Sequence, residues 1–150
     1  MSEFPEARVV LVKARANRAV LDGGWWPRST DPAVELPGLI HALSERFAPI
    51  RYVLLNNAAW DGRFRRVEVD GRTVRTGWFA SLDPALLVAT TEAGDQIDVL
   101  VVPPSTEDGA ANDAMARAAD PDDNAGAPEI LAAVASAEPA SRADSAGRRA

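Results

Sequence analysis

The chain has no cysteine and only one histidine among its 150 residues, which leaves it few groups for catalysis. Without thiols it has no disulfide, no thiol catalysis, no iron–sulfur cluster and no thiolate zinc site. The single histidine, His41, lies beside the apolar stripe of a predicted helix, and we interpret it as a partly exposed structural residue. Neither the G-x-S-x-G nucleophile motif nor a glycine-rich phosphate motif occurs. We therefore expect a protein without enzymatic activity, cofactor or metal.

Long hydrophobic runs and an excess of positive charge are also absent. No apolar run approaches the ~20 residues that span a bilayer, so we expect a soluble, cytoplasmic protein without membrane contact. The formal net charge is −6, and it is unevenly distributed: residues 1–104 hold 12 Lys and Arg against 13 Asp and Glu, whereas residues 105–150 hold 4 against 9. A nearly neutral body with an acidic appendage lacks the positive field that broad nucleic-acid binding needs. Nucleic acid is therefore not an expected partner.

The aromatic residues define the extent of the folded body. All of them lie between Phe4 and Phe79, while the C-terminal third is rich in alanine and acidic residues. A chain of this length fits one domain. We predict a single α+β domain over residues 1–119 and a largely disordered acidic tail over residues 120–150, with a short amphipathic helix at 128–137.

Short β-favouring runs alternate with turn signals along this body. The predicted strands cover residues 8–13, 50–55, 86–91 and 97–102, together with a hairpin around Asp70-Gly71. The first run is apolar on both faces, which predicts an interior strand. In the two-residue-loop register of the hairpin, Val67 faces Val74 and Arg66 faces Arg75.

Two helices complete the predicted fold. One ends at Phe47 and is expected to begin at Pro37 after a short turn at 32–35, because a proline in the helix interior deletes a hydrogen bond. The other begins near Ser105 and runs to Ala119. The order of elements predicts a mainly antiparallel sheet of about six strands, arranged as a meander, with two helices packed on it.

The most distinctive segment is Leu21–Pro32, with the sequence LDGGWWPRSTDP. Two readings of this loop stay open. In one, Trp25 and Trp26 are core anchors, with Arg28 stacked on an indole as an internal cation–π contact. In the other, one indole packs inward while the second forms a binding platform with Arg28, Ser29 and Asp22, since Trp and Arg are enriched at binding hot spots. Trp60 is a candidate member of the same cluster.

A second candidate site uses the arginines of the hairpin. Arg66 and Arg75 are predicted to oppose each other directly, and such a pair is tolerable when an acid or an anionic ligand lies between them. Combined with Arg28, they would form the site of a small anionic-ligand binder or of an enzyme, with Asp22 or Asp61 as the carboxylate. The alternative is a solvated sheet face with local ion pairs. Single-stranded nucleic-acid binding by aromatic platforms and flanking arginines is a third possibility that the charge disfavours.

The segments LDGGWWPRSTDP, ELPGLI, DGRTVRTGWF and VLVVPPST resemble a family of small actinobacterial proteins known only as a domain of unknown function. The resemblance covers about residues 5–119. It implies a small stand-alone soluble protein and carries no activity, cofactor or catalytic residue. On the residues themselves, we predict a non-enzymatic binding or regulatory module that uses the Trp25–Arg28 loop. Its partner would be another protein or a small anionic ligand.

Overall fold

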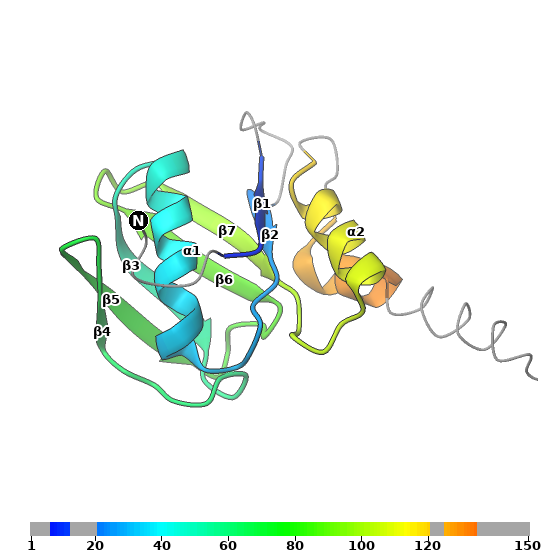
Figure 1. The fold of residues 1–150 in the computed structure, drawn as a ribbon, viewed down its shortest axis with the longest axis horizontal. Coiled ribbons are helices and arrows are strands. Elements are labelled where there is room, and N and C mark those ends of the chain that lie inside the picture. Colours follow the sequence, from blue (N-terminus) through cyan, green and yellow to red (C-terminus); the bar gives the residue numbers. More distant parts are fainter. Residues whose placement is uncertain (1–6, 13–20, 121–124, 135–150) are drawn as a thin grey trace, which may run out of the picture.

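The computed structural model describes residues 7–12, 21–120 and 125–134, and this part of the chain forms a seven-stranded mixed sheet with three helices (Figure 1). In chain order the elements are β1 (Val9–Leu11), β2 (Gly23–Trp25), α1 (Pro32–Arg46), β3 (Ile50–Asn56), β4 (Arg66–Val69), β5 (Arg72–Phe79), β6 (Leu86–Thr91), β7 (Gln96–Val101), α2 (Asp108–Ala118) and a helix at residues 127–134. The order of strands across the sheet is β1-β2-β7-β6-β3-β5-β4.

The α+β class is confirmed, but the predicted six-stranded antiparallel meander with two helices is wrong in detail. Two neighbouring pairs, β2–β7 and β3–β5, are parallel. Strand β3 lies between β6 and β5, so it separates the β6–β7 hairpin from the β4–β5 hairpin. The sequence shows which hairpins form locally. It does not show where they join the sheet, because those pairings depend on contacts between distant segments.

Strand β1 lies at the edge of the sheet, not in its interior as predicted. Its only neighbour among the described strands is β2, and Val10 is 40% exposed. Val9 and Leu11 nevertheless pack against the core, and Val12 is buried. The apolar run therefore reflects the packing of Val9, Leu11 and Val12 against the rest of the protein. It does not show that the strand lies inside the sheet.

Strand β2 lies where the sequence predicts a loop. It contains two glycines, which are poor strand formers, yet it pairs with β1 on one side and β7 on the other. A Cβ atom at Gly24 would lie 2.7 Å from the Cα atom of Met115 in α2. Glycine at this position thus allows the backbone of α2 to approach the sheet closely.

Helix α1 begins at Pro32 and not at Pro37, which corrects the predicted turn at 32–35. The Asp31 side chain caps the helix by accepting a hydrogen bond from the backbone N–H of Ala33, at 3.1 Å. Pro37 sits inside the helix, where it removes one hydrogen bond to the carbonyl of Ala33. The side chain of Pro37 is buried, so packing and the Asp31 cap offset that loss.

The hairpin between β4 and β5 has the predicted turn and register. Asp70 and Gly71 both adopt positive φ, at 54° and 75°, as the tight turn requires. Val67 pairs with Val74 and Arg66 pairs with Arg75.

The sheet separates two hydrophobic cores. Alternate residues of β7 point to opposite faces: Val99 and Val101 belong to the core beneath α1, whereas Leu100 belongs to the core beneath α2. Figure 1 shows α1 lying across the sheet and α2 at its β1–β2 end. Strand β7 therefore contributes to both cores, whereas α1 packs on one core and α2 on the other.

The helix at residues 127–134 completes the second core. It corresponds to the predicted amphipathic helix, and Ile130 and Val134 are buried in the cluster that contains Met115 of α2. Most of the predicted disordered tail, including residues 121–124 and 135–150, lies outside the described residues.

Candidate functional site

The two adjacent tryptophans enter different cores. Trp25 is 1% exposed and belongs to the core beneath α1, where its ring stacks on that of Trp60 at 5.4 Å and 16°. Trp26 is 6% exposed and belongs to the core beneath α2. Successive side chains of an extended segment point to opposite faces, so one WW dipeptide supplies an anchor to each core. This arrangement is the core-anchor reading, and neither indole forms an exposed platform.

The cation seen over the ring of Trp26 is Arg8, a residue that the sequence did not single out. The guanidinium carbon of Arg8 lies 3.7 Å from the ring centroid of Trp26. Its Nε donates to the carbonyl oxygen of Trp26 at 2.9 Å, and Nη2 donates to that of Pro27 at 3.1 Å. Burial, and then the nearby charge of Arg28, lower the pKa of Arg8. Within the described part of the chain, the indole N–H of Trp26 has no hydrogen-bond partner.

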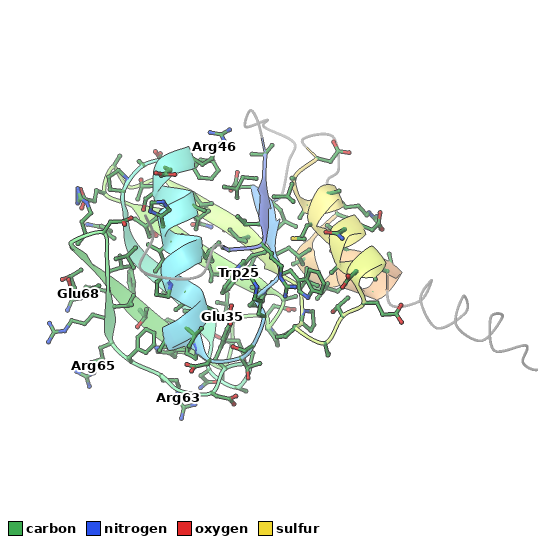
Figure 2. All side chains as sticks on the ribbon, in the orientation of Figure 1. Trp25, Glu35, Arg46, Arg63, Arg65 and Glu68 are labelled. Carbon is green, nitrogen blue, oxygen red and sulfur yellow. The ribbon has the colours of Figure 1, made fainter. Side chains whose placement is uncertain are left out.

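The polar residues of the motif hold the loop in place. Glu35, a buried residue in the first turn of α1, accepts a hydrogen bond from the backbone N–H of Arg28 at 3.1 Å and another from the Ser29 hydroxyl at 2.7 Å. Asp22 is also buried, and its carboxylate accepts from the N–H of Asp98 at 2.9 Å. These bonds tie the loop to α1 and β2 to β7. Figure 2 shows Trp25 between α1 and α2, and Glu35 at the N-terminal end of α1.

A cavity of about 380 Å³ lies beside this loop. It brings together residues from five separate parts of the sequence. Its lining consists of Pro27, Ser29, Thr30, Ala59, Trp60, Asp83, Pro84, Ala85, Val101, Pro103, Pro104, Pro128 and Leu131. Five of these residues are prolines, which fix the backbone, and the cavity falls within the size range of small-molecule sites. We call it the proline pocket.

The polar groups of the proline pocket are few. The Ser29 hydroxyl is engaged by Glu35, and the Thr30 hydroxyl donates to a carboxylate oxygen of Asp61. Asp83 is the only charged residue in the lining, and its Oδ1 accepts from the N–H of Ala85 at 2.8 Å. A ligand in this pocket would therefore meet mostly apolar walls and one carboxylate.

A second hollow, of about 590 Å³, lies on β3, β5 and the segment before β4. It is lined by three arginines and three hydroxyl-bearing residues: Arg51, Arg65, Arg75, Tyr52, Thr73 and Thr76. We call it the arginine hollow. Arg66 lies next to it, because it is the cross-strand partner of Arg75.

The predicted site residues therefore do not form one common site. Ser29 and Trp60 line the proline pocket, Arg75 lines the arginine hollow, and Arg28 lines neither. Asp22, Trp25 and Trp26 are buried. Asp83, Arg51 and the pocket prolines beyond Pro27 were not predicted as site residues, and the Pro103-Pro104 pair was the available signal for the prolines. Arg65 belongs to the group of arginines around the hairpin that the sequence shows as a weak basic patch.

His41 lies outside both cavities, in an ion-pair cluster on α1. Its Nδ1 lies 2.7 Å from Oδ2 of Asp70, and its Nε2 lies 3.4 Å from Oε2 of Glu45. The hydrogen bond with Asp70 is the main cause that raises the pKa of His41 above its ordinary value. The arrangement fits the structural role that the sequence predicts.

We expect this pair to make stability depend on pH. Because the pKa of His41 is raised by folding, the stabilisation is complete below the unfolded-state pKa of about 6.5 and is lost as pH rises through the folded-state value. In Asp70→Asn, the pKa of His41 should fall toward its ordinary value, and this part of the pH dependence should disappear. NMR titration of the single histidine measures the change, with Glu45→Gln as the control at the longer contact. An unchanged pKa in Asp70→Asn would contradict the assignment.

No group of three or more His, Cys, Asp or Glu side chains in the described part of the chain is arranged to hold a metal ion. No helix found there is long and apolar enough to cross a membrane.

The chain matches a known protein family. The model of DUF5994, a family of unknown function, matches residues 8–118. Neither the curated proteins nor the solved structures include a significant match. The matched region contains every strand of the sheet together with α1 and α2, and ends before the helix at 127–134.

Proposed function

Because the chain belongs to DUF5994, a family of unknown function, we propose a function from the geometry of the site: a non-enzymatic binding module whose proline pocket takes a small apolar ligand. The observation that carries the proposal is the pocket of about 380 Å³, formed by the Trp25–Arg28 loop and the segment that follows it together with Trp60 and five prolines. Sites for small molecules are usually concave, mostly apolar and preformed.

The walls of this pocket are rigid in the free protein. Proline fixes the backbone angle φ, so the proline segments lose little conformational freedom when a ligand binds. Trp60 is held by its stack on Trp25, and Pro27 is held by the hydrogen bond from Arg8 to its carbonyl. A preorganised pocket of this kind supports binding without a large entropic cost.

The buried tryptophans therefore act through the loop and not as contact residues. Trp25 and Trp26 anchor the loop in the two cores, and the Glu35 carboxylate accepts a hydrogen bond from the Ser29 hydroxyl. With the loop fixed in this way, Pro27, Ser29 and Thr30 form one wall of the pocket. The proposal keeps the loop as the binding element but assigns the contact to Pro27, Ser29 and Thr30.

The charge of the lining favours a neutral or cationic ligand over an anionic one. Asp83 is exposed and is the only charged residue in the lining. A carboxylate at the rim attracts an ammonium group and repels another carboxylate. The ligand class that fits is a small apolar ring or chain, neutral or with one amino group.

We expect benzylamine to bind more tightly than benzyl alcohol, and benzyl alcohol more tightly than benzoate, since the three probes differ mainly in charge. With about 0.5 kcal/mol per non-hydrogen atom, a probe of this size has a Kd of about 1 mM. Chemical-shift changes in a two-dimensional NMR spectrum measure binding and locate it. In Asp83→Asn, the preference for benzylamine over benzyl alcohol should disappear.

Two alanines next to each other provide a matched test. Ala59 lines the pocket, whereas its neighbour Ala58 is exposed and does not. Ala59→Leu should abolish binding by filling the pocket, and Ala58→Leu should leave the Kd unchanged, with thermal unfolding used to check that both variants fold. The absence of shifts at pocket residues for every probe, at tens of millimolar, would overturn the proposal.

A further inference from the structure

One face of the β4–β5–β3 part of the sheet carries an unusual set of side chains. Val53, Leu55 and Val74 point into the core beneath α1. The residues that alternate with them point to the opposite face, where Tyr52, Arg75 and Arg66 form one row across three strands through the Tyr52–Arg75 and Arg75–Arg66 pairs. These side chains are exposed. The arginine hollow lies on this face.

A β-bulge adds Arg51 to the same surface. The register of β3 against β6 shifts between Ile50 and Tyr52, so Arg51 is an extra residue in the ladder. In a regular strand, Arg51 and Tyr52 would point to opposite faces, but both line the hollow. Bulges commonly redirect a side chain next to a functional site.

The arginines of this surface have no acidic partner among the described residues. No ion pair or side-chain hydrogen bond is formed by Arg51, Arg65, Arg66 or Arg75 within that part of the chain. By contrast, Arg72 of the same hairpin binds Glu92 at 2.6 Å. Figure 2 shows Arg65 and Glu68 projecting away from the β4 edge.

Glu68 is the carboxylate on the same face, and it accepts a hydrogen bond from the hydroxyl of Thr73. One carboxylate does not neutralise four guanidinium groups. Directly opposed arginines such as Arg66 and Arg75 repel each other, and an anion between them relieves this repulsion. The local surface is therefore suited to a phosphate group, although the whole chain has a net charge of −6.

Two exposed aromatic rings lie beside these arginines. Tyr52 and Phe79 are 37% and 46% exposed, the only large aromatic side chains exposed to this degree in the described residues. They approach each other over Gly77: a Cβ atom there would lie 2.9 Å from the Tyr52 hydroxyl oxygen and 3.0 Å from Cε2 of Phe79. The missing side chain of Gly77 thus leaves room for both rings on the sheet. Exposed rings next to cations are the elements that stack nucleobases and bind their phosphates.

We propose that this face binds a nucleotide, with Arg51, Arg65 and Arg75 around the phosphate groups and the ring of Tyr52 or Phe79 stacked on the base. The hollow of about 590 Å³ has the size of a small-molecule site. The phosphate and the base can come from a free nucleotide or from single-stranded nucleic acid. The site is separate from the proline pocket, and the two proposals can fail independently.

The test uses the full chain at low salt with ATP, an eight-nucleotide oligo(dT) and inorganic pyrophosphate, measured by isothermal titration calorimetry. We expect ATP or the oligonucleotide to bind, and Arg75→Ala and Arg51→Ala each to weaken binding at least tenfold. At least one of the variants Tyr52→Ala and Phe79→Ala should weaken nucleotide binding about tenfold and leave pyrophosphate binding unchanged. Tighter binding of the oligonucleotide would identify the source as single-stranded nucleic acid, and tighter binding of ATP would identify it as a free nucleotide.

Arg63→Ala is the matched control. It removes the same charge, but Arg63 donates to the carbonyl of Asn57 and does not line the hollow. It should change the affinity less than twofold. The proposal is overturned if neither ATP nor the oligonucleotide binds, if Arg63→Ala weakens binding as much as Arg75→Ala, or if pyrophosphate binds as tightly as ATP.

Discussion

Replacing Trp25 by alanine is expected to lower the free energy of unfolding by about 3–5 kcal/mol, a large part of the stability of a domain of this size. The Trp25 side chain is 1% exposed and stacks on Trp60 in the core beneath α1. Its removal takes away buried apolar area and leaves a cavity that the surrounding residues fill only in part. Trp60, which lines the proline pocket, also loses its stacking partner.

Urea denaturation followed by circular dichroism measures this loss. Trp25→Phe is the matched control, because it keeps an aromatic ring in the core and should cost less than the alanine variant. The same experiment separates the two readings of the tryptophan loop. A loss below about 1 kcal/mol in Trp25→Ala would contradict the core-anchor assignment, since a surface indole contributes little to stability.

Replacing Gly24 by alanine is expected to destabilise the second core by about 1–3 kcal/mol. The new Cβ atom would lie 2.7 Å from Cα of Met115, so the backbone of α2 would have to move away from the sheet. A flexible side chain can rotate away from such a contact, but a helix backbone moves only with the residues packed around it. Met115 shares its core with Trp26 and Ile130, and these contacts would loosen with it.

Gly109→Ala is the control for this variant. Gly109 lies in α2 itself, and a Cβ atom there meets no heavy atom within 4 Å. Because alanine favours helix more than glycine does, Gly109→Ala should stabilise the protein by up to about 1 kcal/mol. Thermal unfolding of the two variants gives the comparison. An unchanged melting temperature in Gly24→Ala would show that α2 does not depend on the close approach.

The elements that the sequence predicts correctly have strong local signals. The Asp70-Gly71 turn needs two residues with positive φ, and this requirement determines the register that opposes Arg66 to Arg75. The strands at β3, β6 and β7 follow runs of β-branched and aliphatic residues. The start of α1 was predicted at the wrong proline because burial of Pro37 and the cap by Asp31, which are tertiary and geometric effects, outweigh one lost hydrogen bond.

The candidate sites were predicted only in part, for a different reason. Arg66 and Arg75 follow from the hairpin register, but Arg51 joins them through a bulge that forms between β3 and β6. The proline pocket combines Pro27 with Trp60 and Pro103, which lie far apart in the sequence. No local pattern places such residues together.

Local sequence patterns are sufficient to assign the α+β class, most of the strands, the hairpin register and the distinctive LDGGWWPRSTDP segment. The structural role of that segment depends instead on contacts between distant parts of the chain. Strand β2 forms because it pairs with β1 and β7, and its extended backbone then directs Trp25 and Trp26 to opposite faces of the sheet. Local preferences act within a few residues, whereas the burial of an indole depends on which distant helix covers it. The WW dipeptide is therefore an anchor for two cores, and the pocket that we propose as a binding site lies next to it.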